Sequence, residues 1–493
     1  MKLGALSDAI GLNLAEGADL PITGFAIDHR KVAKGNVFGA FQGGVVNGED
    51  FIDDAVAAGA VAVVARAQAK VNGAIHIVDS VPRRAFARMA AAFFAPVPDL
   101  VVAVTGTNGK TSTVEMVRQI WRMTGHRGAS IGTLGITAND ETVSTGLTSP
   151  DIVTFLANMS GLSRQGVTHV AYEASSHGLS QYRNEGLPVA AGAFTNLSRD
   201  HLDYHAGMDD YFEAKMRLFE EVVADGGSAV VWADDEWSAK AMSRAAKRGL
   251  RLFSVGSKGE TIRLLASTPS QLGQTLEVEY RRTRRTVQLP LIGAYQAANA
   301  LVAAGLVLAT GGGADSTFDA LGRIQPVRGR LERAAITGKG APVYVDYAHT
   351  PDALAAAIDA LRPHAAGRLI VVFGAGGDRD QGKRVEMGRV SSSQADFVIV
   401  TDDNPRGEEP SAIRAMVLEG CETVSGASQN LREIGDRREA IGAAIAQAEA
   451  DDIVLIAGKG HEQGQIIGSG ADRTVLPFDD VAVARELAGA RGS

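Results

Sequence analysis

An apolar, β-branched run at residues 101–104 stops abruptly at a glycine-rich polar turn, and this pattern constrains the fold more than any other in the chain. Such a run predicts a buried strand. Beyond the turn, apolar residues return at helical spacing, so a helix follows. A strand, a glycine-rich loop and a helix in this order aim backbone N–H groups and a helix N-terminus at a phosphate. The loop comprises Thr105, Gly106, Thr107, Asn108, Gly109, Lys110 and Thr111.

Two side chains of this loop have the chemistry that a triphosphate requires. Lys110 supplies a point charge for the β- and γ-phosphates, and the Thr111 hydroxyl can ligate Mg²⁺. The generic motif has a glycine five residues before Gly109, where this chain has Val104, so the loop is a shorter variant. A strand–helix turn capped by a lysine is the structural alternative. The pattern predicts a loop that binds a nucleoside triphosphate.

Length and charge limit the class of protein. At 493 residues the chain is too long for one hydrophobic core and predicts about three domains. Alternating apolar runs and alanine-rich segments, with 57 glycines, indicate an α/β fold. The net charge of −8 provides no general attraction for nucleic acid or an anionic membrane. The basic run at 281–285 is interpreted as a solvated hairpin, because it lacks aromatic residues for stacking bases.

Other features predict a cytoplasmic location. A single cysteine, Cys421, excludes an internal disulfide and is expected to be a buried apolar side chain. Residues 1–19 have no basic segment followed by an apolar one, so no signal peptide is expected. The most apolar stretches, 55–65 and 301–309, are too short to span a bilayer. We therefore expect no membrane insertion.

Polar residues follow the predicted strands of segment 99–325. Glu173 ends a strand-like run, and residues 196–205 follow the next one. Because ligands bind outside the carboxyl ends of the strands in open α/β sheets, we expect both to meet the phosphate loop at one edge. Carboxylates and imidazoles there could serve Mg²⁺ binding and phosphoryl transfer, although a hydrogen-bonded structural role is the alternative for each histidine. The candidates beside Glu173 are His177, Asp200, His201, Asp203 and His205.

Segment 326–493 repeats the arrangement of a strand followed by a polar loop. Its loops carry Arg379 and Arg406, whose forked donors suit carboxylates. They also carry Asp403 and Glu462, which could hold an ammonium group. Residues 374–377 are only a weak dinucleotide-binding signal, since a third spaced glycine is missing. The charge pairing predicts a site for an amino acid.

Taken together, these motifs resemble those of the Mur ligases, ATP-dependent enzymes that form peptide bonds in bacterial cell-wall precursors. The resemblance covers essentially the whole chain. It implies a UDP-substrate domain at 1–98, a central ATP-binding domain with a P-loop ATPase-like parallel sheet at 99–325, and a Rossmann-like amino-acid domain at 326–493. The motifs are T-G-T-N-G-K-T at 105–111, E-A-S-S-H-G-L at 173–179, T-N-L-S-R-D-H-L-D-Y-H at 195–205, G-R-L-E at 329–332 and D-Y-A-H-T-P at 346–351, with Lys215 and Asn299.

The resemblance also implies roles for individual residues. Lys215 would be carbamylated, which turns a cation into an anionic ligand, and Lys110 would act in catalysis; His349 is a positioning group or a structural residue. The neighbours of Mg²⁺ would be Thr111, Glu173, Lys215 and His205. ATP would also contact Asn299, Arg330 and Asp346. The muramoyl-peptide end of the nucleotide substrate would contact Thr148, Ser149, Ser175, Gln181 and Arg183, and its uridine end Ile27, His29, Gly44, Val45 and Val46. The amino acid would contact Arg379, Asp403, Asn404, Pro405, Arg406, Gly458 and Glu462.

Residues 403–406, D-N-P-R, resemble the family member that adds meso-2,6-diaminopimelate to UDP-N-acetylmuramoyl-L-alanyl-D-glutamate through an acyl phosphate. Diaminopimelate ends in a carboxylate and an ammonium, whereas lysine ends in an ammonium alone. Arg406 would pair with that carboxylate and stay unpaired with lysine, so we expect discrimination against lysine. We also expect a monomer. The alternatives are a lysine-adding or folylpolyglutamate-type ligase, and a nucleotide-hydrolysing switch that needs no amino-acid pocket.

Overall fold

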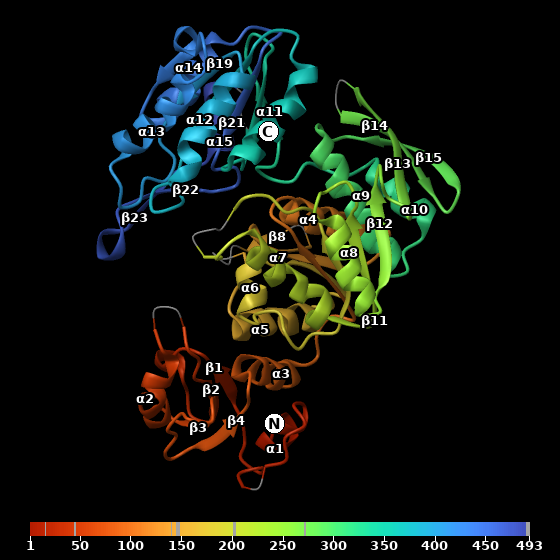
Figure 1. Cartoon of the computed structure of the whole chain (residues 1–493), viewed down its shortest axis with the longest axis vertical. Helices are drawn as coiled ribbons and strands as arrows, with labels where there is room; N and C mark the ends of the chain where they lie inside the picture. The colour runs from red at the N-terminus through yellow and green to blue at the C-terminus, as the bar shows by residue number, and fades with distance from the viewer. Residues whose placement is uncertain are drawn as a thin grey trace.

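Three β-sheets, each built within its own stretch of the chain, organise the fold (Figure 1). The computed structural model describes residues 1–14, 16–43, 46–139, 141–143, 148–200, 204–270 and 273–489, apart from the side chains of 427, 428 and 471. In Figure 1 the N-terminal and C-terminal domains lie at opposite ends, with the central domain between them. The sheets lie within the three segments expected from the sequence, and the domain limits at 98 and 325 remain predictions.

The N-terminal domain is built on a four-stranded parallel sheet in the order β1-β2-β3-β4. Phe25 of β1 and Phe86 of α3 meet edge to face, with ring centres 5.2 Å apart, in a core that Leu3 and Leu6 of α1 also enter. The elements are α1 (Leu3–Asp8), β1 (Gly24–Ala26), η1 (His29–Lys31), β2 (Asn36–Gly39), η2 (Gly48–Phe51), α2 (Ile52–Ala57), β3 (Ala60–Ala65), β4 (Ile75–Val78) and α3 (Pro82–Phe94).

Strand β5, which leads into the glycine-rich loop, lies inside the central eleven-stranded sheet, whose order is β15-β14-β13-β12-β11-β10-β5-β9-β6-β7-β8. It runs parallel to both of its neighbours, β9 and β10, so the three carboxyl ends open on the same edge, as predicted. The elements are β5 (Leu100–Thr105), α4 (Lys110–Met123), β6 (Gly128–Gly132), β7 (Gly135–Ala138), β8 (Glu141–Val143), α5 (Ile152–Arg164), β9 (His169–Glu173), α6 (Ser176–Ser180), β10 (Val189–Phe194), α7 (Met208–Arg217), η3 (Leu218–Val222), β11 (Val223–Trp232), α8 (Ser238–Lys247), β12 (Arg251–Gly256), β13 (Ile262–Ser270), β14 (Gly273–Tyr280), β15 (Thr283–Leu289), α9 (Ala294–Ala309) and α10 (Ala314–Leu321).

The side chains of β5 alternate between two hydrophobic cores. Val101 and Ala103 join the core that contains residues of α5. Val102 and Val104 join the core formed with α4 and α9 on the opposite face. Successive residues of a strand point to opposite faces, so a strand covered on both sides is apolar without a break. This double burial explains the uninterrupted run at 101–104 and holds the loop that follows it in a fixed position.

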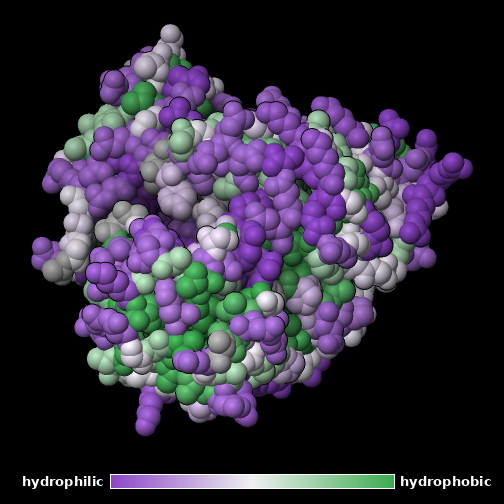
Figure 2. Space-filling view, turned by 60° about the horizontal axis from the view of Figure 1, so that its bottom comes forward, coloured by the Kyte–Doolittle hydropathy of each residue, from purple (hydrophilic) through white to green (hydrophobic). Residues whose placement is uncertain are grey.

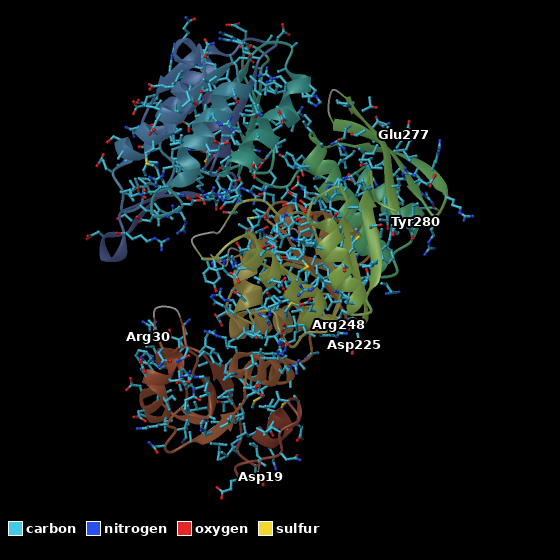
Figure 3. All side chains as sticks on the ribbon, viewed as in Figure 1. Asp19, Arg30, Asp225, Arg248, Glu277 and Tyr280 are labelled. Atoms are coloured by element: carbon cyan, nitrogen blue, oxygen red, sulfur yellow. The ribbon has the colours of Figure 1, made fainter. Side chains whose placement is uncertain are left out.

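The central sheet is parallel from β13 to β6 and antiparallel at both edges. Strands β14 and β15 are joined by the two-residue turn Arg281-Arg282, in which both φ angles are positive, 51° and 65°. Such a turn links antiparallel strands without a crossover helix. The hairpin interpretation of the basic run is therefore confirmed. Figure 3 labels Glu277 and Tyr280 on β14 of this hairpin.

The C-terminal domain carries a six-stranded sheet in the order β16-β17-β21-β18-β19-β20, parallel except for the pair β16–β17. Its four loops after β17, β18, β19 and β21 consequently lie on one edge. The elements are β16 (Glu332–Ile336), β17 (Pro342–Asp346), α11 (Pro351–Leu361), η4 (Arg362–His364), β18 (Leu369–Phe373), α12 (Gly382–Gln394), β19 (Phe397–Val400), α13 (Pro410–Glu422), η5 (Ala427–Asn430), β20 (Leu431–Glu433), α14 (Arg437–Gln447), β21 (Ile453–Ala457), β22 (Gly464–Ile467), η6 (Gly470–Asp472), β23 (Thr474–Pro477) and α15 (Asp480–Leu487).

Ion pairs join the N-terminal and central domains. Arg84 and Arg88 of α3 lie 3.6 and 3.4 Å from the buried carboxylate of Glu185, and Arg84 also pairs with Glu221. Burial raises the pKa of Glu185 and the two arginines oppose that rise. Because leaving one of these charges buried without its partner is costly, the pairs restrict how the two domains can move apart.

Hydrophobic residues gather in the lower part of the face drawn in Figure 2, below a mostly hydrophilic upper part. In the N-terminal domain the large apolar side chains that stay exposed are Met1, Ile27, Val46 and Val78. Two of them, Ile27 and Val46, are predicted uridine contacts. Cys421 is buried, as expected. Across the residues that the structure describes, no helix combines the length and the apolar character needed to cross a membrane.

Candidate active site

Hydrogen bonds to the segment that follows β10 fix the conformation of the glycine-rich loop. The backbone N–H of Asn108 donates to Asn196 Oδ1 (2.9 Å), and the backbone N–H of Thr107 donates to the Asn196 carbonyl (2.9 Å). Thr195 Oγ1 donates to the Asn108 carbonyl at 2.6 Å. Two adjacent strand ends therefore shape one loop, and α4 begins directly after it at Lys110. This is the geometry that a phosphate-binding loop needs.

Two glycines of this loop are required by their neighbours. Gly109 has a φ of 86°, and a Cβ there would collide with the Asn299 amide of α9. Gly106 has a φ of 148°, and a Cβ there would collide with Thr195 Oγ1. Both conformations favour glycine. The contact also shows why Asn299, a buried polar residue in an alanine-rich helix, belongs to the site: its amide lies against the loop.

Two lysines converge on the same loop carbonyl. Lys110 Nζ donates to the carbonyls of Gly106 (2.9 Å) and Thr107 (2.8 Å), and Lys215 Nζ, which is fully buried, donates to the Gly106 carbonyl (2.8 Å). Burial lowers the pKa of Lys110, whereas the carboxylates of Glu173 and Asp200 raise it. Burial, followed by the charge of Lys110, holds the pKa of Lys215 well below its usual range. Two lysine side chains therefore lie where phosphates would bind, and burial disfavours the charged form of each, most strongly for Lys215.

Glu173 and His205 have different surroundings. The buried Glu173 carboxylate, at the end of β9, accepts from the Thr133 N–H (2.7 Å) and hydroxyl (3.2 Å). His205 uses both ring nitrogens, Nδ1 with Asp210 (3.0 Å) and Nε2 with Ser176 (3.0 Å). Among the residues that the structure describes, no three His, Cys, Asp or Glu side chains come together as a metal site. The His205 contact with Mg²⁺ stays a prediction, as do His201 and Asp203, which lie outside the described residues.

The donors near the loop nevertheless fit Mg²⁺. This ion uses one or two protein oxygens and completes its shell with waters and substrate phosphates. Thr111, at the start of α4, and Glu173, on the neighbouring strand, offer a hydroxyl and a carboxylate at the same edge. Thr111 Oγ1 accepts a hydrogen bond from Arg330 at 3.2 Å. A sparse set of oxygen donors beside a triphosphate site is what this ion requires.

A cavity of about 320 Å³ opens beside the loop, between the ends of β10 and β11 and the start of α9. It is lined by aromatic, amide and carboxylate side chains, and its size suits part of a small ligand such as a nucleotide. A larger cavity of about 780 Å³ lies between the central and C-terminal domains, and no predicted site residue lines it. The lining of the smaller cavity includes Asn299, Asn196, Trp232, Asp234, Asp235 and Tyr295.

Arg330 and Asp346, predicted to contact ATP, lie at the junction of the central and C-terminal domains. The guanidinium of Arg330 covers the Tyr347 ring at 4.4 Å. The carboxylate of Asp346 accepts from the backbone N–H groups of Leu331 (2.7 Å) and Ala348 (2.8 Å), and from the Tyr295 hydroxyl (3.4 Å). Burial raises the pKa of Asp346 and Arg330 opposes the rise. In this arrangement Asp346 organises the junction, and its contact with ATP remains a prediction.

The residues predicted to hold the muramoyl peptide form one hydrogen-bonded chain. Thr148 Oγ1 lies 3.0 Å from Thr133 Oγ1, next to Glu173, and Ser149 Oγ lies 2.9 Å from Ser175 Oγ. Arg183 donates to the Ser149 carbonyl (2.8 Å) and to Gln181 Oε1 (2.7 Å). The structure therefore brings this predicted set together on the central domain, beginning at the phosphate loop's edge.

The predicted uridine contacts lie on the N-terminal domain. Ile27 and His29 follow β1, and the His29 ring stacks on Phe51 with ring centres 4.3 Å apart and planes 2° apart. Figure 3 labels the adjacent Arg30 on the side of this domain that lies toward the other domains, opposite Asp19. Val46 is exposed, and Gly44 and Val45 lie outside the described residues. The uridine assignment remains a prediction.

The four polar loops of the C-terminal domain form a charged pocket. Arg379 and Arg406 both lie next to Gly376, and burial, followed by the charge of Arg379, lowers the pKa of Arg406. The carboxylate of Asp403 is buried, and its Oδ2 accepts no hydrogen bond from the described residues. Gly458 lies against this carboxylate, because a Cβ there would lie 2.6 Å from Asp403 Oδ2. Two guanidinium groups and an unsatisfied carboxylate oxygen are the counterparts of an amino-acid head group.

Asn404 and Pro405, which were also predicted to contact the amino acid, are buried next to these charged groups. Asn404 is buried, and its side-chain amide donates to Glu462 Oε2 at 2.8 Å. Pro405 is also buried, and Arg406, which follows it, adopts a positive φ of 51° while its Nη1 donates to the Gly377 carbonyl at 2.9 Å. Asn404 and Pro405 thus set the position of Arg406 and Glu462.

Several polar residues at these sites were not singled out from the sequence. The backbone N–H of Thr133 donates a hydrogen bond to the Glu173 carboxylate. Burial, followed by the like charge of Arg183, lowers the pKa of Arg83. Lys383, at the start of α12, lowers the pKa of His349, although burial is the larger cause. Lys459 is fully buried behind the amino-acid pocket. Only Lys459 had a local signal, its position between two glycines after an apolar run.

Family models match most of the chain. The models described as "Mur ligase family, catalytic domain", "Mur ligase middle domain" and "Mur ligase, glutamate ligase domain" match residues 21–102, 104–307 and 329–460, in that order along the chain. The matched ranges follow the three sheets. They contain the phosphate loop, the residues after β9 and β10, and the loops of the C-terminal pocket up to residue 460.

Individual relatives are similar over nearly their full length. The UDP-N-acetylmuramoyl-L-alanyl-D-glutamate--2,6-diaminopimelate ligase of Zymomonas mobilis is 58% identical, over 98% of this chain and 98% of that protein. The ligase of the same name from Bradyrhizobium diazoefficiens is 51% identical, over 98% and 99%. A solved structure with that name is 31% identical, with a TM-score of 0.73 and 99% of both chains covered. A folylpolyglutamate synthase of Mycobacterium tuberculosis bound to ADP is 18% identical, with a TM-score of 0.63 over 77% of this chain and 92% of the other, and shares the fold alone.

Proposed function

This chain belongs to the Mur ligase family, and we propose that it adds meso-2,6-diaminopimelate to UDP-N-acetylmuramoyl-L-alanyl-D-glutamate at the expense of ATP. The near-complete similarity to relatives that carry this name supports the proposal. The reaction forms an amide bond in a precursor of the bacterial cell wall. The substrates are ATP, the UDP-linked dipeptide and the amino acid.

The observation that carries the choice of amino acid is the charge pattern of the C-terminal pocket. Arg406 and Arg379 can donate hydrogen bonds to the distal carboxylate of diaminopimelate, and Asp403 Oδ2, which has no partner among the described residues, can accept one from its distal ammonium. L-Lysine lacks that carboxylate and would leave both guanidinium groups without a counterion. Because Arg406 is half-buried, leaving it unpaired costs more binding free energy than leaving the exposed Arg379 unpaired, and Arg406 is therefore the group through which the pocket favours diaminopimelate.

The phosphate loop serves the first step. A γ-carboxylate oxygen of the D-glutamyl residue attacks the γ-phosphorus of ATP, the bond to ADP breaks, and an acyl phosphate forms. Lys110, now held on the Gly106 and Thr107 carbonyls, is in position to move onto the β- and γ-phosphates. The start of α4 adds its backbone N–H groups. Fixed positive charge at this edge stabilises the negative charge that moves from the substrate to ADP.

Thr111 and Glu173 are the groups that would hold Mg²⁺, and a bound Mg²⁺ supplies charge neutralisation for the phosphates. Lys215 would join them after carbamylation. Its strongly lowered pKa supports this assignment, because only a neutral amine can attack CO₂. Carbamylation would also place an anion near the Lys110 ammonium.

The second step requires loss of a proton from the amine of diaminopimelate. The amine nitrogen attacks the acyl carbon, and phosphate departs with the original carboxylate oxygen. His349 is a candidate positioning group for this step, with a structural role as the alternative. Burial and the charge of Lys383 lower its pKa, so the ring is neutral near pH 7. Its Nδ1 lies 2.9 Å from the Tyr347 carbonyl, which can only accept a hydrogen bond, so the lone pair of the ring is on Nε2.

The remaining assignments follow from the same reaction. The hydrogen-bonded chain from Thr148 to Arg183 would hold the muramoyl peptide, and the Ile27–Val46 region would hold uridine. Asn299, Arg330 and the cavity beside the loop would hold ATP. One chain contains all of these groups, which supports a monomeric enzyme. A cytoplasmic location is consistent with the buried, unpaired Cys421.

The test is phosphate release with ATP, Mg²⁺ and the UDP-linked dipeptide, with meso-diaminopimelate or L-lysine added in parallel. Release that depends on diaminopimelate supports the proposal. Equal release with lysine would retain a ligase and reject the role of Arg406. Release without any amino acid would instead indicate a nucleotide-hydrolysing switch. With ¹⁸O in the substrate carboxylate, label should appear in the released phosphate if the acyl phosphate forms.

A further inference from the structure

A lysine that faces no solvent lies directly behind the amino-acid pocket. Lys459 follows β21 and is fully buried. Glycines flank it, Gly458 with a φ of 114° and Gly460 with a φ of 54°. A Cβ at Gly460 would lie 2.7 Å from Tyr347 Cβ. Both flanking positions therefore favour glycine, and this backbone turns the side chain of Lys459 into the domain.

The ammonium of Lys459 closes a triangle of hydrogen bonds. Lys459 Nζ donates to Asn404 Oδ1 (2.9 Å) and to Glu462 Oε2 (3.1 Å). Asn404 Nδ2 donates to the same Glu462 oxygen (2.8 Å). The backbone N–H of Ile466 donates to Asn404 Oδ1 (2.9 Å). The triangle links the loop after β19, the loop after β21 and the start of β22.

This triangle fixes the orientation of the Asn404 amide. Asn404 Oδ1 receives two donors, Lys459 Nζ and the Ile466 N–H. A flipped amide would place its NH₂ group against both donors and its oxygen against the Glu462 carboxylate. Both changes remove hydrogen bonds from buried groups, which is costly. Asn404 is therefore locked, and the Asp403–Arg406 loop is locked with it.

The triangle also gives the two carboxylate oxygens of Glu462 different surroundings. Oε2 accepts from both Lys459 and Asn404, whereas Oε1 accepts no hydrogen bond from the part of the chain that the structure describes. One oxygen is thus free for a ligand. Lys459 forms an ion pair with Glu462, whereas Asp403 forms none with the described residues, although the charges of both carboxylates raise the pKa of Arg406.

We propose that Lys459 is a positioning residue that sets the selectivity of the pocket for an amino-acid head carrying both a carboxylate and an ammonium. The proposal rests on the proposed function. Without the Lys459 charge, Glu462 becomes a second uncompensated acid and the Asn404 loop loses its lock. Such a pocket binds the carboxylate of diaminopimelate less well and tolerates the simple ammonium end of lysine better.

The test compares Lys459→Met, which keeps the length and removes the charge, with the matched control Lys339→Met. Lys339 lies in the same domain and forms an exposed pair with Glu449. For Lys459→Met we expect the ratio of kcat/KM for diaminopimelate to kcat/KM for lysine to fall roughly tenfold or more, the factor equivalent to about 1.4 kcal/mol. The KM for ATP should stay unchanged. Lys339→Met should leave the ratio unchanged.

Each outcome of this test either supports or refutes the proposed role of Lys459. An unchanged ratio in a folded Lys459→Met enzyme would refute the proposal, as would an equal rise in KM for diaminopimelate and for ATP, which would indicate general damage. If Lys459→Met does not fold, Lys459→Gln is measured instead, because it keeps a polar tip in the triangle. Failure of both to fold while Lys339→Met folds would assign Lys459 a structural role only. A wild-type enzyme that does not use diaminopimelate would refute the proposed function rather than the role of Lys459.

Discussion

Replacing Arg406 by alanine tests the central electrostatic argument. The backbone at Arg406 has a φ of 51°, and arginine and alanine both carry a Cβ, so the conformational cost at this position is similar in the two proteins. The substitution therefore removes the guanidinium without adding backbone strain. It also removes the hydrogen bond to the Gly377 carbonyl. Thermal unfolding of the variant measures that contribution separately.

The magnitude follows from the surroundings of the guanidinium. A hydrogen bond to a charged group contributes about 1.5–3 kcal/mol, and Arg406 could form two with a carboxylate. Arg406 is only half buried, and Arg379 lies close enough to replace part of its charge. We therefore expect a total loss near the value for one bond, about 1.5–3 kcal/mol. This corresponds to a fall in kcat/KM for diaminopimelate of roughly 10- to 150-fold.

The assay is steady-state phosphate release with each substrate varied in turn. The KM values for ATP and the UDP-linked dipeptide should change little, and kcat/KM for L-lysine should not fall, because lysine has no distal carboxylate. Arg438→Ala is the control, since Arg438 forms an exposed pair with Glu486 on α15, away from the pocket. A parallel loss for lysine, or an equal rise in KM for ATP, would refute the reasoning.

Three further predictions concern the phosphate loop and its supports. Lys215→Met should abolish phosphate release. Burial lowers the Lys215 pKa, so in the pH range just below the unfolded pKa the unfolded chain binds more protons and wild-type stability rises with pH, with a slope of up to about 1.4 kcal/mol per unit. Urea unfolding over that range should show the slope in the wild type and a smaller one in the variant. Gly109→Ala should lose the stabilisation by ATP in thermal unfolding, because its Cβ collides with the Asn299 amide; a normal ATP shift would contradict this. Gln119→Leu removes two hydrogen bonds to Gln325, each contributing about 0.5–1.5 kcal/mol, and should lower kcat without changing the KM for ATP, because they link the phosphate-loop helix to the segment that leads into the C-terminal domain. An unchanged kcat would argue against a catalytic role for this link.

The phosphate loop could be predicted from the sequence because its determinants are local. The apolar run of β5, the glycine-rich turn and the helical spacing of α4 follow one another within one stretch of chain. The convergence of Glu173 and Asn196 on that loop was also predictable, because parallel strands place their carboxyl ends on one edge. The charged pocket of the C-terminal domain follows from the same rule applied to β18, β19 and β21.

Other features depend on contacts that no local pattern specifies. Nothing near Arg83 indicates that it approaches Arg183, one hundred residues along the chain. The burial of Lys459 depends on Asn404 and Glu462 meeting it from two loops. The sequence likewise could not show that both ring nitrogens of His205 are used by Asp210 and Ser176. Pairing between polar residues that are far apart in the sequence depends on the packed fold, and the spacing of apolar residues along the chain does not predict it.

The linker between the central and C-terminal domains connects the two chemical sites physically. Gln325 forms two hydrogen bonds with Gln119 of α4, at 2.8 and 3.2 Å. Arg330 donates to Thr111, at the first turn of the same helix. Between them, Gly329 lies so close to the backbone of Gly460 and His461 that a Cβ would collide. One short segment thus contacts the phosphate-loop helix twice and the amino-acid loop once.

The three contacts differ in what nucleotide binding would require of them. The Arg330 contact is a single bond of 3.2 Å to a hydroxyl that Mg²⁺ would also require, whereas the Gln325 contact consists of two bonds to one side chain. The contact with Thr111 is therefore the one that nucleotide binding would replace, which frees Arg330 for the phosphates.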